Sequence, residues 1–412
     1  MNRILLSFFI LLLAACSASK KVSQTPAVPV VTAAPTVDTL QLEKDTVPPP
    51  APASMEVKIG LLLPMQIKRH FDEDTVPDTN PLILPEALPA LHFYEGALLA
   101  ADSLSIGRCM VRFKIIDTGI DSLSTITKLN TTSLSDMDAV ISLLPPVYSR
   151  NIAAASDRWK KPVYIFTAPN TQILEGHPYL YLVSPSNNTQ IRLMAAYLSA
   201  TYPASNFIAV YRDQRKEDDL AKLFQSVIDS AAGKAGTTAL YNWKGGWSGL
   251  KSKLAKAKRN LLIVPTSDES FLSSLLNKMR EEKDNYTFML CGLPAWESFE
   301  SIDPLVMKDF DATIFNGSFI DYKSTAVSSF RKRFIDSYHA DPLPQAFWGY
   351  DLVLKIAVDE NRKVNRLTLP DFMPTVEVNK DPKWQMAGEG AGFENRNINF
   401  LRFGDYDLVR LK

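Results

Sequence analysis

From residue 56 onward, the pattern of apolar and polar residues predicts strands and helices that alternate along the chain. Residues 57–63 form a short apolar run that ends at Pro64, which predicts a strand buried on both faces. Residues 93–104 carry apolar side chains at helical spacing, which predicts an amphipathic helix. A buried strand followed by such a helix indicates a parallel α/β sheet. Sheets of this kind bind ligands in the loops beyond the carboxyl ends of their strands.

The same order continues through two successive series of elements. The first series predicts further strands at residues 110–116, 139–143 and 162–166, and the second predicts strands at residues 207–211, 238–241, 261–264 and 287–291. A strand at residues 179–186 is expected to cross from the first series to the second. The predicted fold class is therefore α/β, with two doubly wound Rossmann-like lobes joined by crossover strands at a hinge.

The C-terminal third predicts a return from the second lobe. Residues 311–317 are expected to form the returning strand, and two helices follow it. Two short strands then flank a hairpin turn at Gly404-Asp405. The expected organisation is lobe 1 at residues 56–182 and 314–370, lobe 2 at residues 183–313, and a C-terminal segment at residues 371–412 that returns to the lobe 2 or hinge region.

The N-terminus predicts export and lipid anchoring. A basic start and an apolar stretch too short to span a bilayer precede Leu13-Ala14-Ala15-Cys16, which matches the bacterial lipobox. We therefore expect residues 1–15 to be a lipoprotein signal peptide and the Cys16 thiol to carry lipid, which would anchor the chain in a bilayer. The alternative is an ordinary signal peptide with an incidental cysteine. Because nothing acidic directly follows Cys16, the expected location is the cell envelope, at the periplasmic face of the outer membrane.

Residues 16–55 are predicted to be an extended tether, because seven prolines fall within residues 20–55 and no helical or strand period is present. Lys and Arg together number 45, as do Asp and Glu, so no overall charge favours nucleic acid. The two remaining cysteines, Cys109 and Cys291, fall on predicted strands of different lobes. We therefore predict two free buried thiols rather than a disulfide.

Sequence patterns of catalysis are lacking. The histidines have no metal-like spacing, and there is no Gly-x-Ser-x-Gly elbow, Walker loop or dinucleotide-binding glycine pattern. We therefore expect no enzymatic activity, no catalytic residues, no bound metal and no cofactor.

Three segments of the chain carry a family resemblance. They are Phe93-Tyr-Glu-Gly-Ala-Leu-Leu-Ala-Ala-Asp, Asn206-Phe-Ile-Ala-Val-Tyr-Arg-Asp213, and Ala346-Phe-Trp-Gly-Tyr-Asp-Leu352. These segments resemble type 1 periplasmic solute-binding proteins of the branched-chain amino-acid receptor kind. The resemblance covers about residues 56–412 and is greatest to a lipoprotein branch found in Bacteroidetes. It implies capture of a small molecule between two closing lobes, with an ABC transporter as a possible partner.

The resemblance also implies where ligand contacts fall. Two lobe 1 loops of the family align with Pro145-Pro146-Val-Tyr148-Ser149 and with Thr167-Ala168-Pro169, where prolines replace backbone donors. The acid that binds the ligand ammonium in amino-acid receptors should lie within residues 292–296, and none is there. The predicted contacts are Tyr148, Ser149, Thr167, Ala168, Thr266, Ser267 and Trp296.

These departures argue against a free amino acid, because a buried ammonium without a carboxylate is costly. A larger or less polar ligand is expected instead, such as a sugar or muropeptide fragment stacked on Tyr148 or Trp296. Each residue also has a structural interpretation. Tyr148 and Trp296 would then pack in the core, Ser149 and Thr167 would cap helices, and Lys216 would belong to a solvated charged turn.

Two functions follow from this sequence. The first is a membrane-tethered solute-binding lipoprotein. The second is an interaction lipoprotein of the same fold that regulates or scaffolds peptidoglycan synthesis, as an outer-membrane lipoprotein of this fold does. The proline-rich interval at residues 76–89 would distinguish them, by capping a cleft in the first case or projecting outward in the second.

Overall fold

The computed structural model describes residues 53–70, 83–119, 121–166, 168, 170–233, 237–364, 367–369, 374–376, 379 and 382–411, with the side chains of residues 69 and 70 excepted. The chain separates into residues Met1–Ala51 and Pro52–Lys412, and the description below concerns the second unit. The predictions for the signal peptide, Cys16, the tether up to residue 52, Thr167 and the first half of the interval 76–89 lie outside the described residues.

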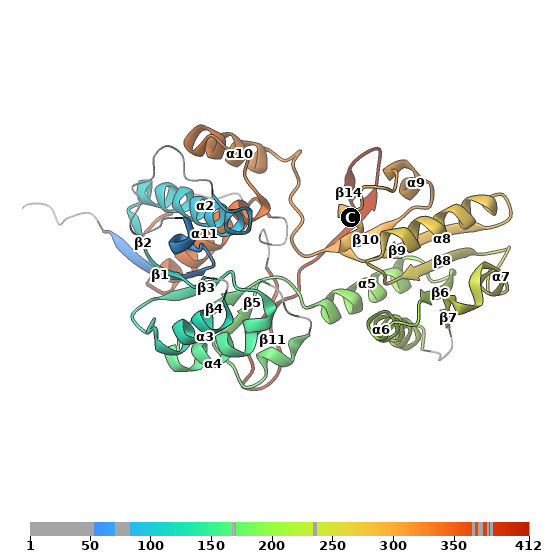
Figure 1. Cartoon of the computed structure of the whole chain (residues 1–412), viewed down its shortest axis with the longest axis horizontal. Helices are drawn as coiled ribbons and strands as arrows, with labels where there is room; N and C mark the ends of the chain where they lie inside the picture. The colour runs from blue at the N-terminus through green and yellow to red at the C-terminus, as the bar shows by residue number, and fades with distance from the viewer. Residues whose placement is uncertain are drawn as a thin grey trace, which may run out of the picture. The chain divides into compact units, whose positions relative to one another are not determined.

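Two seven-stranded sheets define two lobes (Figure 1). The lobe 1 sheet contains β1 (Met55–Leu63), β2 (Cys109–Asp117), β3 (Ala139–Ser142), β4 (Val163–Ile165), β5 (Leu180–Leu182), β11 (Trp384–Met386) and β12 (Phe393–Asn395). The lobe 2 sheet contains β6 (Asn206–Tyr211), β7 (Thr238–Asn242), β8 (Arg259–Val264), β9 (Thr287–Gly292), β10 (Thr313–Asn316), β13 (Asn399–Phe403) and β14 (Leu408–Arg410).

The first five strands of each sheet are parallel and have the same spatial order. In lobe 1 the order is β2-β1-β3-β4-β5, and in lobe 2 it is β7-β6-β8-β9-β10. The predicted two-lobed, doubly wound α/β fold is thus confirmed. It follows from the buried apolar runs, because a parallel strand covered by helices on both faces is apolar along most of its length.

Helices connect these strands. Lobe 1 has the short α1 (Ile67–His70), α2 (Leu88–Ile106), α3 (Ser122–Thr131), α4 (Ser149–Trp159), α10 (Thr325–Tyr338) and α11 (Pro344–Val364), and lobe 2 has α5 (Asn187–Thr201), α6 (Arg215–Ala231), α7 (Gly246–Lys251), α8 (Glu269–Glu281) and α9 (Pro304–Asp309). The helices α2 and α11 cross with their backbones in close approach. A Cβ atom on Gly96 would lie 1.9 Å from the carbonyl oxygen of Ala346, so only glycine fits there.

The prediction that residues 311–317 form a strand returning to lobe 1 is wrong. β10 pairs with β9 in the lobe 2 sheet, so the boundary expected between residues 313 and 314 divides a strand that belongs wholly to lobe 2. Ile314 is fully buried in the lobe 2 core, which is why the strand adds to that sheet. The sequence pattern shows that a strand is buried and does not show which sheet buries it.

The C-terminal segment contributes to both sheets, rather than to lobe 2 or the hinge alone. β11 and β12 extend the lobe 1 sheet beyond β5, whereas β13 and β14 extend the lobe 2 sheet beyond β10. Glu394 on β12 is fully buried and accepts hydrogen bonds from the backbone nitrogen of Ser186 (2.7 Å) and the hydroxyl of Thr189 (2.9 Å). Its carboxylate thereby occupies the N-terminus of α5, where helix donors are unpaired.

Cys109 and Cys291 are free and buried, on strands of different sheets, which confirms the prediction of two thiols. Burial raises the pKa of both thiols and keeps them protonated. Within the described ranges, no helix combines the length and apolarity that a bilayer crossing requires. The same residues contain no cluster of His, Cys, Asp and Glu side chains that could hold a metal ion.

Candidate ligand-binding site

The strand order of each sheet marks where a ligand site is expected. In a doubly wound sheet, a crevice opens at the carboxyl ends of two neighbouring strands whose connections run in opposite directions. In lobe 2 these strands are β6 and β8. Arg212 follows β6, and residues 265–268 follow β8, so these two loops form the centre of the candidate site.

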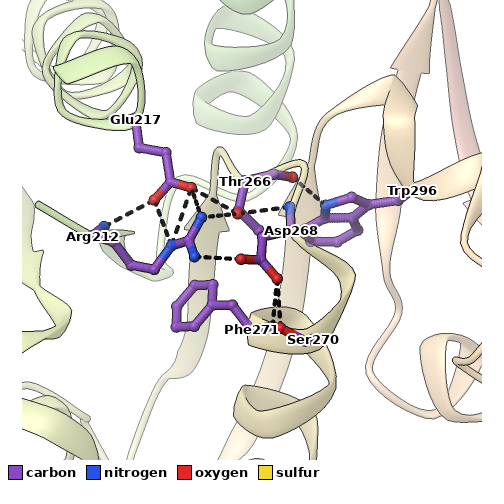
Figure 2. Close-up of polar contacts among 7 residues, drawn as sticks. All are labelled: Arg212, Glu217, Thr266, Asp268, Ser270, Phe271 and Trp296. Carbon is purple, nitrogen blue, oxygen red and sulfur yellow. Dashed lines mark hydrogen bonds and ion pairs between the residues drawn. The ribbon is translucent and has the colours of Figure 1, made fainter. Parts of the chain in front are cut away.

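A charged network joins these two loops (Figure 2). Arg212 donates from Nη1 to Asp268 at 2.6 Å, and its Nε bonds to Glu217 at 3.2 Å. Glu217, in the first turn of α6, also accepts the backbone N–H of Arg212 at 3.0 Å. The Arg212 and Glu217 side chains are only 21% and 7% exposed, so water weakens their attraction less than at an exposed pair.

Thr266 and Asp268 complete the network. The Thr266 hydroxyl donates to Glu217 at 2.8 Å and accepts the backbone N–H of Asp268 at 3.1 Å. Asp268 is the N-cap of α8 and accepts from the backbone nitrogen of Phe271 at 3.0 Å and from the Ser270 hydroxyl at 2.8 Å. Every side chain in the network therefore has partners within the protein, and the network holds the two loops in place.

The hydrogen bonds keep both carboxylates ionised. The bond from the Phe271 N–H, with those from Ser270 and Arg212, lowers the pKa of Asp268 to about 2. Burial opposes ionisation of Glu217, but hydrogen bonds from Arg212 and Thr266 outweigh it and lower the pKa of this carboxyl. The same pairing with Glu217 raises the pKa of Arg212. The network is thus permanently charged at physiological pH.

A pocket of about 220 Å³ opens at the carboxyl edge of the lobe 2 sheet. Its walls come from the two helices α5 and α6, from the loops after β8 and β9, and from β10. The lining residues are Asn187, Gln190, Ile191, Lys216, Leu220, Ser267, Leu293, Pro294, Ala295 and Phe315. The pocket is large enough for a small organic molecule and combines an apolar wall with a few polar groups, as ligand sites commonly do.

The three lobe 2 residues predicted to bind ligand have different environments in the structure, and only one of them lines the pocket. Ser267 is exposed and lines the pocket. Thr266 is fully buried, and its hydroxyl is engaged in the network. Trp296 is 1% exposed, and its Nε1 donates to the Thr266 carbonyl at 2.9 Å. A Cβ on Gly292 would meet the Trp296 ring at 2.2 Å, so that ring lies against the end of β9 and offers no free face for stacking.

The lobe 1 candidates are less accessible than predicted. Tyr148, Ser149 and Ala168 follow β3 and β4, as expected, and are 9%, 8% and 4% exposed. Tyr148 packs in a lobe 1 core cluster, in agreement with its structural interpretation. The capping interpretation of Ser149 is wrong, because Ser149 is the first residue of α4 and the N-cap position is Tyr148.

Sequence reasoning missed Lys216 as a pocket residue. Its neighbours are charged, and this pattern predicts a solvated turn. In the structure, α6 begins at Arg215, and Lys216 in its first turn lines the pocket. The available signal was the position of Lys216 at the start of the helix that follows β6, one of the two strands at the change of strand order.

No family profile matches the chain, and no curated protein matches it. A putative branched-chain amino acid ABC transporter protein from Rhodospirillum rubrum matches with a TM-score of 0.60 at 13% identity, over 87% of this chain and 100% of that one. An ABC transporter substrate-binding protein from Desulfitobacterium hafniense, in complex with Leu, matches with a TM-score of 0.53 at 14% identity, over 86% and 100%. The chain has the fold of the type 1 periplasmic binding proteins.

The same fold occurs in a regulator. The C-domain of LpoA from Haemophilus influenzae, a regulator of PBP1A, matches with a TM-score of 0.54 at 11% identity, over 86% of this chain and 100% of that domain. A type 1 periplasmic binding fold therefore supports either ligand capture or protein regulation, and the site must distinguish them.

Proposed function

We propose that this chain is a non-catalytic binding protein that takes a small molecule at the carboxyl edges of its two sheets. The observation that carries the proposal is the pocket of about 220 Å³ beside the change of strand order in lobe 2. The rigid Arg212 network beneath it supports the proposal, because a site needs loops that hold their positions. Ser267 contacts the ligand from lobe 2, while Thr266 and Trp296 support the loops. Ser149, Thr167 and Ala168 are the lobe 1 counterparts, while Tyr148 packs in the lobe 1 core.

The proposed ligand is not a standard free amino acid. The described lining of the pocket contains no carboxylate for a ligand ammonium. The two nearest acids of the network, Glu217 and Asp268, are already bound by Arg212. A ligand with an ammonium group would therefore lose its hydration without gaining a partner.

We further propose that the protein is a lipoprotein of the cell envelope, attached through acylated Cys16 at the periplasmic face of the outer membrane. The lipobox at residues 13–16 and the proline-rich tether support this location. The quoted segments resemble the Bacteroidetes lipoprotein branch, which also supports it.

Native mass spectrometry of the protein purified from its own cells tests the proposed function. A co-purifying small molecule that is lost on denaturation is the expected result. An empty protein that also shows no thermal shift with amino acids, sugars and muropeptides would refute it. Regulation of a peptidoglycan-synthesis enzyme is the second candidate, favoured by the fold match to the LpoA C-domain. It predicts that crosslinking recovers such an enzyme.

A further inference from the structure

The described lining of the lobe 2 pocket contains a positive charge and no negative charge. Lys216 is the one charged residue among its described lining residues, and the remaining polar groups are neutral. Among the described residues, no carboxylate forms an ion pair with Lys216. The nearby lysines of the same region are paired, since Lys222 bonds to Asp218 at 2.7 Å and Lys244 bonds to Asp213. Lys216, an exposed side chain, is therefore the cation within the described pocket lining that is left for a ligand.

The acids of the Arg212 network beside the pocket are occupied. Glu217 and Asp268 are bound by Arg212, and Asp268 also caps α8. Together these three groups carry a formal charge of −1, which the positive end of the α8 dipole partly offsets. Glu394 is fully buried against the N-terminus of α5. The α5 terminus therefore already has its anion, and Lys216 is the group that can attract another.

Apart from Lys216 and the neutral polar groups, the pocket lining is apolar. Ile191 and Leu220 contribute from helices α5 and α6, and Phe315 contributes from β10. Ile191 is 1% and Phe315 is 2% exposed, so these side chains belong to the lobe 2 core and form a fixed surface. A ligand that fills this pocket needs an apolar body together with a group that Lys216 can bind.

We propose that the lobe 2 pocket binds the anionic end of a small organic acid, with Lys216 paired to its carboxylate and Ile191, Leu220 and Phe315 against its apolar body. Ser267 donates a hydrogen bond to the same carboxylate. The inference rests on the proposed function and specifies its ligand class. An amine is disfavoured because its charge repels Lys216 and the described pocket lining offers it no carboxylate.

Matched ligands with one body and different charges test this inference. Calorimetry on the full chain in detergent would compare 4-methylpentanoate with 4-methylpentanamide, 3-methylbutylamine and leucine, and phenylacetate with phenylacetamide and phenethylamine. At least one acid should bind more tightly than its amide, and the amines and leucine should not bind. Lys216→Gln should weaken binding of that acid by about tenfold, since a charge-assisted hydrogen bond is lost. Binding of the amide should change little.

Lys222→Gln is the matched control, because Lys222 lies on the same helix and is paired with Asp218 outside the pocket. It should leave acid binding unchanged. Tighter binding of an amine or of leucine, or acid binding that Lys216→Gln does not weaken, would overturn the inference while leaving the proposed function intact. A co-purifying ligand without an anionic group would do the same. Absence of any bound probe or co-purifying ligand would overturn both.

Discussion

Replacement of Gly349 by alanine should change the stability of lobe 1 in two opposite ways, through helix propensity and through steric overlap. Alanine is the better helix former by about 1 kcal/mol, so propensity alone predicts a more stable protein. Gly349 lies in α11 where that helix crosses α2, and the two are neighbours in Figure 1. A Cβ atom there would lie 2.1 Å from the carbonyl oxygen of Phe93, about 1.3 Å short of the 3.4 Å at which ordinary contact begins.

The obstacle is backbone, which cannot rotate away as a side chain can. The two helices must therefore separate and lose contacts among the fully buried Phe93, Ala97 and Val353. Overpacking of this kind costs about 3 kcal/mol at the upper end of its usual range. Subtraction of the propensity gain leaves a net loss of about 2 kcal/mol in the free energy of unfolding.

Urea unfolding measured by hydrogen exchange of α2 and α11 peptides would report on lobe 1 alone, because a two-lobed chain need not unfold in one step. Ser329→Ala, on the exposed face of α10, is the control and should raise stability by a few tenths of a kcal/mol. An increase in stability of Gly349→Ala like that of the control would refute the close helix crossing.

Three further predictions concern other parts of the chain. Glu217→Gln should lower the free energy of unfolding of lobe 2 by about 3 kcal/mol, because it breaks the largely buried ion pair with Arg212. Urea titration would measure this loss, with Glu281→Gln, at an exposed position on α8, as the control. Asp351 accepts a hydrogen bond from the backbone nitrogen of Thr375 (2.8 Å), and burial raises the pKa of its carboxyl to about 6. Because the folded state holds this proton more tightly than the unfolded state, the stabilisation is complete below about pH 4 and is lost as the pH rises through 6. Stability of the parent relative to Asp351→Asn should therefore fall by about 3 kcal/mol as the pH rises from 4 through 6, and a pH-independent difference would contradict this. Cys16→Ser should abolish incorporation of labelled fatty acid and release the protein from membranes, whereas continued membrane attachment would refute lipid anchoring.

The strand series was predictable because burial on both faces produces continuous apolar runs. The assignment of β10 was not predictable, because Ile314 would be buried equally well in either sheet. β11 and β12 were missed for another reason. Each has three residues, and exposed positions in Trp384–Met386 give no regular alternation. Short edge strands are defined by the neighbour they pair with, and a local pattern does not contain that information.

The place of the candidate pocket in the fold was predictable, but only part of its lining was. Ser267 follows a predicted strand, and the loop beyond such a strand is where ligands bind. Trp296 is a packing residue because its ring lies against Gly292. That contact depends on the turn between the two residues. Lys216 lies among charged residues, and only the folded structure shows that it lines the pocket. The pocket gathers residues from five elements, so no single segment could reveal it.

The division of the last strands between both lobes has a consequence for biogenesis. Until residues 384–410 have been synthesised, β5 and β10 are open sheet edges with unpaired backbone groups. Neither lobe can complete its hydrogen bonding early, although most of its core lies far upstream. An incomplete chain therefore exposes two edges that can pair with other strands. Loss of the last strands should therefore harm both lobes at once.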